Sequence, residues 1–272
     1  MTDLRERLRV LRAAIATFAC VYTALRLHEL WAIAHLPAAH FEPTGLAWFV
    51  MPPVVVMAIA CATVVLLAVF AAGWRARVVG PLAALGFALV FSYRSAWGQI
   101  FHTENLVALH LIALAIASWI DDPKGAVRLL ALLTVATYVL AGIAKLRLAG
   151  LAWMDSVDGA QLRNQIAVDN LRKALLGGGT APLATVLLDH PAAFGPLSIA
   201  TLVLELGAPI ALLGGRYAVA WVTASWAFHL GILLVMWIVF PYPLLGFAYL
   251  PLLPVERGIA WIRCRYRNDL PS

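Results

Sequence analysis

Charged residues are scarce in this chain. Only 12% of its 272 residues are Asp, Glu, Lys or Arg, whereas 63% are hydrophobic. Soluble domains usually carry about a quarter charged residues, and so few charges cannot cover the apolar surface of a soluble domain of this length. A lipid bilayer is the natural solvent for such a composition. We therefore expect an all-α polytopic membrane protein.

Cysteines are few, and the common catalytic and metal-binding motifs are missing. The three cysteines, at positions 20, 61 and 264, show no CxxC spacing, so they predict neither a metal site nor a redox pair. The chain contains no GxSxG, HExxH, Walker loop or GxGxxG. Its GGGT stretch, residues 177–180, lacks the flanking strand that a nucleotide site requires. We expect no resident metal.

The net charge of +6 does not predict nucleic-acid binding. The basic residues cluster in short segments between apolar runs, a distribution typical of membrane orientation. Zinc-finger and aromatic RNA-binding signatures are missing from the sequence. Membrane lipids, rather than nucleic acid, are the expected surroundings.

Hydropathy divides the chain into about eight candidate transmembrane helices. Most of them approach the roughly 20 residues that cross a hydrocarbon core, and the last is rich in proline, so we expect it to be tilted or re-entrant. The arginines before the first segment mimic a signal peptide, but no small-x-small cleavage site follows, and we expect a retained first helix. The segments lie near 12–36, 47–73, 78–97, 104–120, 127–146, 196–214, 217–240 and 242–256.

The positive-inside rule orients these segments with both termini in the cytoplasm. This orientation places thirteen of the 20 Lys and Arg residues inside and six outside, with Arg26 within the first span. We expect a basic cytoplasmic N-terminus (1–11), a transmembrane domain (12–256) and a basic cytoplasmic tail (257–272). Tail arginines can also contact anionic headgroups.

One long outer loop, residues 150–195, interrupts the pattern. Its stretch DSVDGAQLRNQIAVDNLRKALL reads as an amphipathic helix. The apolar face carries Leu162, Ile166 and Leu171. We expect this helix to lie on the outer membrane face as a cap. The opposing polar face carries Arg163, Asp169, Arg172 and Lys173.

Several ionisable residues stand inside apolar runs, where charge is expensive and usually faces a bundle interior or a cavity. A rise of about 1.5 Å per residue places them in the middle and outer half of the membrane. These depths are compatible with a shared polar cavity that opens outward. Its candidate members are Arg26, Glu29, Tyr138, Lys145, Glu205 and His229.

Each candidate also has a structural explanation. Lys145 can snorkel to the outer headgroups, and Arg26 with Glu29, at i and i+3, can neutralise each other. His229 can hydrogen-bond a neighbouring helix, and Glu205 can be protonated and inert. Tyr138, Gly142 and Lys145 share one helix face, on which Gly142 would let a neighbouring helix or ligand approach closely.

Four stretches resemble vitamin K-dependent γ-carboxylases. YVLAGIAKLRLAGLAW, residues 138–153, is similar to the segment that carries the active lysine of that family. The helix–basic turn–helix of 70–106, LVLELGAPIALL at 202–213 and the FH within 225–250 follow in the family's order. The chain as a whole is most similar to the bacterial HTTM-domain (horizontally transferred transmembrane domain) proteins. The resemblance implies a multi-pass protein of the bacterial inner membrane.

The resemblance also implies a chemistry. Lys145 matches the base that deprotonates a reduced, vitamin K-like quinone, and such a base needs the depressed pKa of a desolvated lysine. His102 matches the functional histidine that opens the fourth span. Carboxylation of an exported peptide would make that peptide a partner.

This sequence departs from the family at several positions, and the departures leave enzyme status open. Ala144 replaces a second lysine, and Ile100 and Phe101 replace the asparagines before the histidine. The residues after Val255 are too few for the lumenal domain that binds peptide. One reading is a quinone- or lipid-dependent enzyme with an outer-facing site around Lys145. The alternative is a non-catalytic binding, maturation or assembly component for an exported peptide or lipid; a transporter relay ranks last, because no inverted repeat is visible.

Overall fold

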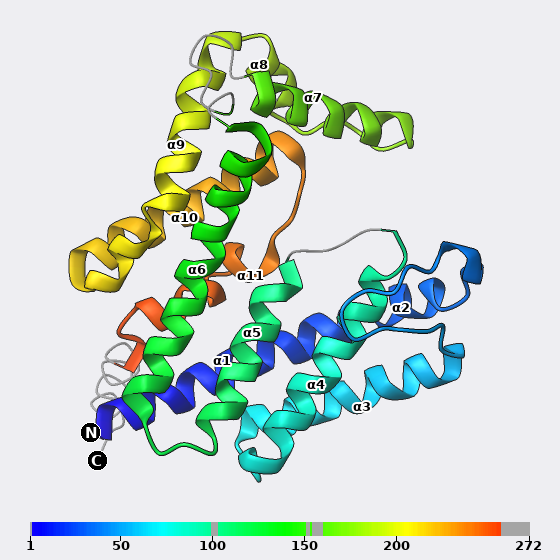
Figure 1. The fold of residues 1–272 in the computed structure, drawn as a ribbon, viewed down its shortest axis with the longest axis vertical. Helices are drawn as coiled ribbons and strands as arrows, with labels where there is room; N and C mark the ends of the chain where they lie inside the picture. The colour runs from blue at the N-terminus through cyan, green and yellow to red at the C-terminus, as the bar shows by residue number, and fades with distance from the viewer. Residues whose placement is uncertain (1, 99–102, 151–152, 154–159, 257–272) are drawn as a thin grey trace, which may run out of the picture. The chain divides into compact units, whose positions relative to one another are not determined.

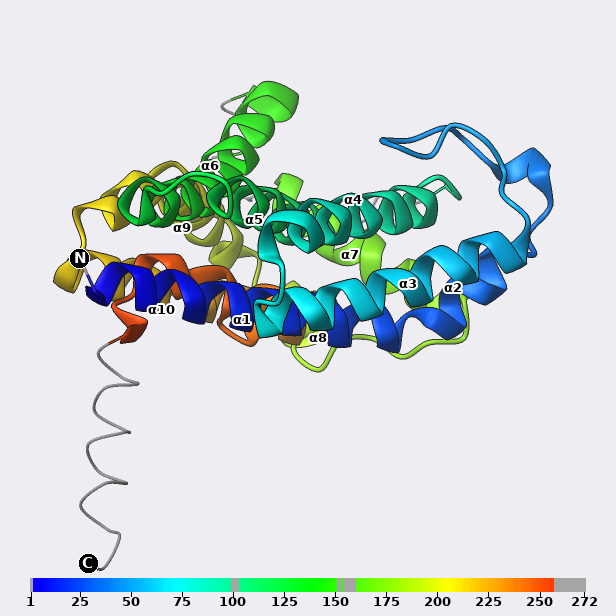
Figure 2. The ribbon, with the colours of Figure 1, turned by 90° about the horizontal axis from the view of Figure 1, so that it is seen from below.

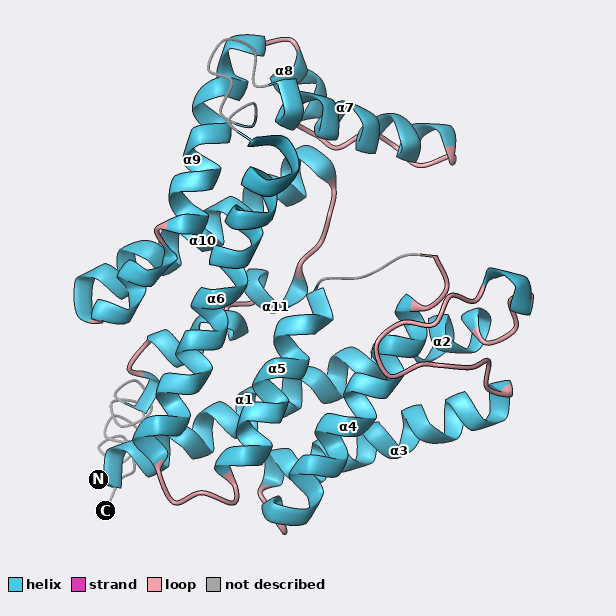
Figure 3. Cartoon of the chain, viewed as in Figure 1, coloured by secondary structure: helices cyan, strands magenta, loops and turns pink. Residues whose placement is uncertain are grey.

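The computed structural model describes residues 2–98, 103–150, 153 and 160–256, and these residues are helical or in short connections. Figures 1 and 3 show helices throughout, and no strand occurs in these ranges apart from an isolated bridge between Thr44 and Ala47. The expected all-α fold class is confirmed.

The chain folds as two compact units. The first comprises Met1–Leu133 with Pro254–Ser272, and the second comprises Thr134–Leu253. Helix α6 (Pro123–Ala149) is continuous through the boundary between them.

The first unit is a set of helices that pack in succession. Helix α1 packs on α3, α3 on α4 and α4 on α5, while α5 returns to α1; Figure 2 shows α1 and α3 running side by side. The interior is filled by large side chains such as Leu67, Phe70, Phe87 and Leu111, all inaccessible to solvent. The elements are α1 (Thr2–Leu25), α2 (Leu27–Ile33), η1 (Ala38–His40), α3 (Pro53–Ala72), α4 (Ala76–Ser95) and α5 (Thr103–Ala117).

The ends of α3 follow from local sequence. Pro53 opens the helix, where its missing N–H costs nothing and its fixed φ suits the first turn. Gly73 closes it in the left-handed conformation (φ +83°) and donates its backbone N–H to the carbonyls of Val69 and Phe70. The chain then turns through Arg75, also left-handed (φ +42°), into α4.

The second unit is arranged around α10. This helix contacts α7, α8, α9, α11 and both neighbouring 3₁₀ helices, and the carboxyl-terminal part of α6 joins the same unit. The elements are α7 (Ala160–Leu175), α8 (Ala184–Leu188), η3 (Pro191–Ala193), α9 (Phe194–Leu206), η4 (Ala208–Leu213), α10 (Gly215–Met236), α11 (Pro241–Leu244) and η5 (Phe247–Leu252).

Five helices in the described ranges are long and apolar enough to cross a membrane. Exposed apolar side chains on them, such as Val54, Val65 and Leu140, suit a surface that faces lipid. The chain is therefore a membrane protein. The five segments are Leu4–Leu25, Pro53–Ala72, Ala76–Ser95, Pro123–Ala149 and Gly215–Met236.

The remaining predicted spans are shorter than expected. Helix α5 has 15 residues and α9 has 13, fewer than the roughly 20 that a full crossing needs. The predicted span 242–256 consists of α11 and η5, each a few residues long. The predicted first span, 12–36, is interrupted at Arg26, between α1 and α2. The described residues thus contain five helices of spanning length, fewer than the eight spans predicted.

The amphipathic helix predicted within residues 150–195 is present as α7. On its predicted apolar face, Ile166 is buried, whereas Leu171 is 59% exposed. Asn170 takes the buried place instead: its amide donates to the carbonyl oxygens of Ile166 and Val235, and its oxygen accepts from the backbone N–H of Ala181. The helix docks on its unit through a satisfied polar side chain, which hydropathy does not reveal.

Candidate functional site

A lysine–glutamate ion pair lies in the second unit. Lys145 on α6 donates from Nζ to both carboxylate oxygens of Glu205 on α9, at 2.5 and 2.7 Å. The Glu205 side chain is 4% exposed and that of Lys145 is 24% exposed. Among membrane helices a pair of this kind holds two charges that would be costly apart.

Gly142 makes the pair possible. It stands one turn before Lys145, and a Cβ atom at this position would lie 2.8 Å from Leu206 Cδ2 and 3.2 Å from Glu205 Cβ. A side chain would therefore push α9 away from α6. The prediction that Gly142 permits close approach is confirmed, and the approaching group is helix α9.

An indole ring adjoins the lysine. Lys145 Nζ lies 5.6 Å from the centroid of the Trp153 ring, within cation–π range. Trp153 is 3% exposed, and its Nε1–H has no hydrogen-bond acceptor among the described residues. A buried donor without an acceptor costs about 1–3 kcal/mol, so an acceptor atom of a ligand would be stabilised here.

Four further aromatic and imidazole side chains, Tyr138, Tyr249, His229 and Trp221, cluster in the same unit. The hydroxyls of Tyr138 and Tyr249 lie 2.8 Å apart, and His229 Nδ1 lies 3.3 Å from the Tyr249 hydroxyl and 2.8 Å from the Ser225 carbonyl oxygen. Trp221 packs edge-on against Tyr138 at 4.7 Å. These groups satisfy one another, and Tyr138 shares the face of α6 that carries Lys145 two turns later.

The first unit holds a larger ionic network centred on Arg94 of α4. Its guanidinium donates to Glu29 Oε1, at 2.6 and 2.8 Å, and to Glu104 Oε1, at 2.8 Å. Tyr22 donates to Glu104 Oε1 at 2.7 Å, and Arg26 donates to Glu29 Oε2 at 2.9 Å. Two arginines and two glutamates balance, and only Glu104 Oε2 is buried there without a partner in the part of the chain described.

The sequence-derived candidates therefore separate into two groups. Arg26 and Glu29 pair in the first unit, whereas Tyr138, Lys145, Glu205 and His229 belong to the second. His102 lies outside the described residues.

Sequence reasoning did not include Arg94, Glu104, Tyr22, Tyr249 or Trp153 among the candidates. Arg94 and Glu104 stand at helix ends, where charge is ordinary, and Tyr22 and Tyr249 stand in apolar runs, where an aromatic is ordinary. An arginine in the last turn of α4 facing an acidic first turn of α5 was the available signal.

Within the described ranges, no three His, Cys, Asp or Glu side chains gather as a metal site would require. Comparisons of the chain with protein-family models, with curated proteins and with solved structures find no match. Its interpretation rests on the geometry above.

Proposed function

We propose that the chain is a γ-carboxylase-like (HTTM-type) membrane protein in which Lys145 and Glu205 form a proton-transfer site for a reduced quinone or a similar hydroxyl-bearing lipid. The observation that carries the proposal is the contact of Lys145 Nζ with both Glu205 oxygens, 5.6 Å from the ring centroid of Trp153, whose N–H has no acceptor among the described residues. One base, one cation and one free donor are the parts that deprotonation of a hydroxyl requires.

The proton-transfer roles follow from the pairing. An ammonium group has no lone pair, so the Glu205 carboxylate is the group that can accept a proton first. Once Glu205 is neutral, Lys145 loses its counter-charge and can stabilise an oxyanion instead. A reduced quinone would supply the acidic hydroxyl and two reducing equivalents, and dioxygen would be the oxidant that accepts them, so that quinol and dioxygen give quinone and hydrogen peroxide. This assignment differs from the resemblance, which gives Lys145 itself the role of base.

The side chains near the pair fit such a ligand in part. Trp153 offers a buried donor that a quinol oxygen would satisfy. The space beside Gly142, by contrast, is filled by Leu206 and Glu205, so this glycine serves helix packing rather than ligand access.

We also infer the topology within the bacterial inner membrane, with both termini cytoplasmic. The five spanning helices and three short crossing segments, α5, Pro191–Leu206 and the η5 region, would make eight crossings, the even number that termini on the same side require. Helix α7 would lie on the outer membrane face, a position supported by an exposed apolar stripe with i, i+3, i+7 spacing. The stripe consists of Val168, Leu171 and Leu175.

The test compares four proteins purified in lipid nanodiscs. Wild type, Lys145→Arg and the exposed control Arg172→Ala should retain a quinone detectable by mass spectrometry and should oxidise added quinol with dioxygen as the electron acceptor. Glu205→Gln should lose quinol oxidation, by about 10²–10⁴-fold for removal of a general base. Lys145→Arg keeps the positive charge but cannot act as a base.

The outcomes distinguish Glu205 as the base from Lys145 as the base, and an enzyme from a non-catalytic component. Inactive Lys145→Arg with active Glu205→Gln would return the base to Lys145, as the resemblance implies. Equal quinone content and no turnover in every protein would contradict the enzyme and favour the non-catalytic component for an exported peptide or lipid.

A further inference from the structure

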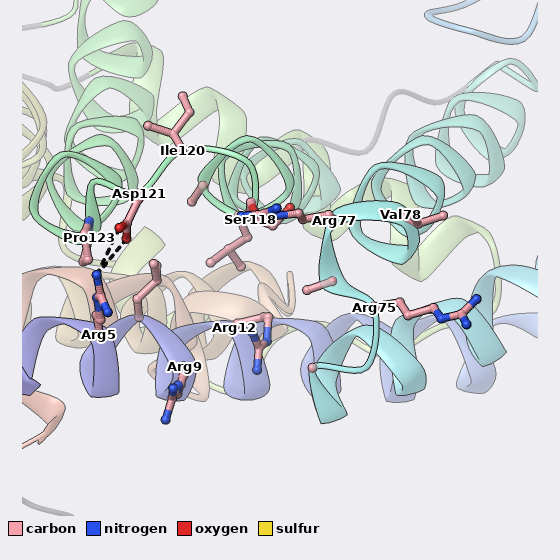
Figure 4. A pocket seen from close by; sticks show the side chains of 15 residues that line it. Arg5, Arg9, Arg12, Arg75, Arg77, Val78, Ser118, Ile120, Asp121 and Pro123 are labelled. Carbon is pink, nitrogen blue, oxygen red and sulfur yellow. Dashed lines mark hydrogen bonds and ion pairs between the residues drawn. The ribbon is translucent and has the colours of Figure 1, made fainter.

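A basic pocket lies in the first unit, and no residue of the two ionic clusters lines it. It has a volume of about 640 Å³, within the roughly 300–1,000 Å³ typical of ligand pockets. Its walls come from the first turns of α1, the α3–α4 turn and the α5–α6 connection (Figure 4). Five arginines line it: Arg5, Arg9, Arg12, Arg75 and Arg77.

The charges in this pocket are not balanced. Asp121 is the only carboxylate in the lining, and it pairs with Arg5 at 3.0 and 3.1 Å. Four guanidinium groups are left without a carboxylate among the residues that line the pocket. Like charges gathered this closely repel one another unless an anion joins them.

The fold keeps room for one of these arginines. The left-handed Gly73 stands where a Cβ atom would overlap the Arg12 guanidinium. Arg12 Nε is buried and has no hydrogen-bond partner among the described residues. A buried, unsatisfied donor on a cation is suited to an acceptor atom of a bound ligand.

The other arginines form a rim around Arg12. Figure 4 shows Arg5 reaching Asp121, Arg77 beside Ser118, and Arg9 and Arg75 extending outward. Arg77 Nε donates to the Ser118 carbonyl oxygen at 3.2 Å. Arg77, Arg9 and Arg75 line the same pocket as Arg12.

The surroundings place the pocket at the level of lipid headgroups. It lies at the ends of helices that can span a membrane, and Trp74 and Trp119, next in sequence to lining residues, are 60% and 63% exposed. Exposed tryptophans at helix ends are typical of the membrane interface. Val78 and Ile120 add exposed apolar surface to the same lining.

We propose that this pocket binds the headgroup of a phospholipid that carries two phosphate groups. Guanidinium groups bind phosphate oxygens with paired, charge-assisted hydrogen bonds, and basic pockets between transmembrane helices are known to hold such headgroups. Two phosphates match the surplus of arginine better than one. The apolar lining accommodates the start of the acyl chains.

The experiment titrates the purified full chain in detergent micelles and counts bound lipid by native mass spectrometry. The probes are diphosphatidylglycerol with two phosphates, phosphatidylglycerol with one, and zwitterionic phosphatidylcholine. Diphosphatidylglycerol should bind wild type most tightly. Arg12→Gln and the exposed Arg9→Gln should each weaken that binding about fivefold, the effect of one basic residue at an anionic surface.

Arg128→Gln is the matched control, because Arg128 is exposed on α6 of the same unit but does not line the pocket. It should bind diphosphatidylglycerol as wild type does. Equal weakening in Arg128→Gln would show that bulk surface charge, not the pocket, attracts the lipid and would overturn the proposal. Displacement of the lipid by glycerophosphate or inorganic phosphate at similar concentrations would also overturn it, in favour of a soluble anion. Arg9→Gln keeps the test decisive should Arg12→Gln not fold.

Discussion

The two ionic clusters neutralise their charged side chains in different ways. In the first unit, Arg94 joins two carboxylates through three hydrogen bonds, and a second arginine and a tyrosine complete the set. In the second, one ammonium meets one carboxylate, near an indole ring whose N–H has no acceptor in the described part of the chain. The first network is nearly saturated, and the second is left open.

The difference indicates that the two clusters have different roles. A guanidinium is always charged and holds partners in a fixed fork, so the Arg94 network fixes helices in place. Lysine and glutamate can each gain or lose a proton when a ligand changes their surroundings. The saturated network is therefore suited to structure, and the open pair to chemistry.

The largest expected effect comes from breaking the saturated network. Arg94→Leu leaves Glu29 and Glu104 without their shared cation, and removal of one partner from a buried ionic network costs about 3–5 kcal/mol. Denaturant unfolding in detergent should show this loss. Arg94→Lys should recover part of it, because an ammonium can reach only part of the guanidinium's contacts. A loss below about 1 kcal/mol, the range of exposed pairs, would show that the network does not hold the unit together.

An intermediate effect is expected where the open pair depends on close helix packing. Gly142→Ala places a methyl group against Leu206 and Glu205, and overpacking of this kind costs about 1–3 kcal/mol. The displacement should also separate Glu205 from Lys145 and lower the proposed quinol oxidation more than stability alone explains.

Gly231→Ala in α10 is the matched control for this substitution. Nothing lies within 4 Å of a Cβ atom at Gly231, so the change should stabilise the helix by about 0.5–1 kcal/mol through its better helix propensity. Equal stability and equal quinol oxidation in the two variants would show that the Lys145–Glu205 pair does not depend on the absence of a side chain at Gly142.

The two clusters also show which features of the structure can be predicted from the sequence. Apolar runs predicted the spanning helices, and the amphipathic period predicted α7, because both signals are local. Lys145 and Glu205 were recognised singly as buried charges, but their contact joins positions 60 residues apart and depends on how α9 packs against α6. The break at Arg26 escaped hydropathy because apolar residues resume at Leu30, directly after His28 and Glu29.

The smallest expected effect tests whether the edge of the saturated network matters. Arg26 and Glu29 are 36% and 32% exposed, and exposed i,i+3 pairs contribute about 0–1 kcal/mol. Arg26→Gln should therefore change the unfolding midpoint little, because Glu29 keeps its two hydrogen bonds from Arg94. Glu29→Gln should cost more, since it weakens the bonds to Arg94 as well. A larger loss from Arg26→Gln than from Glu29→Gln would mean that Arg26, and not Arg94, is the cation on which the network depends.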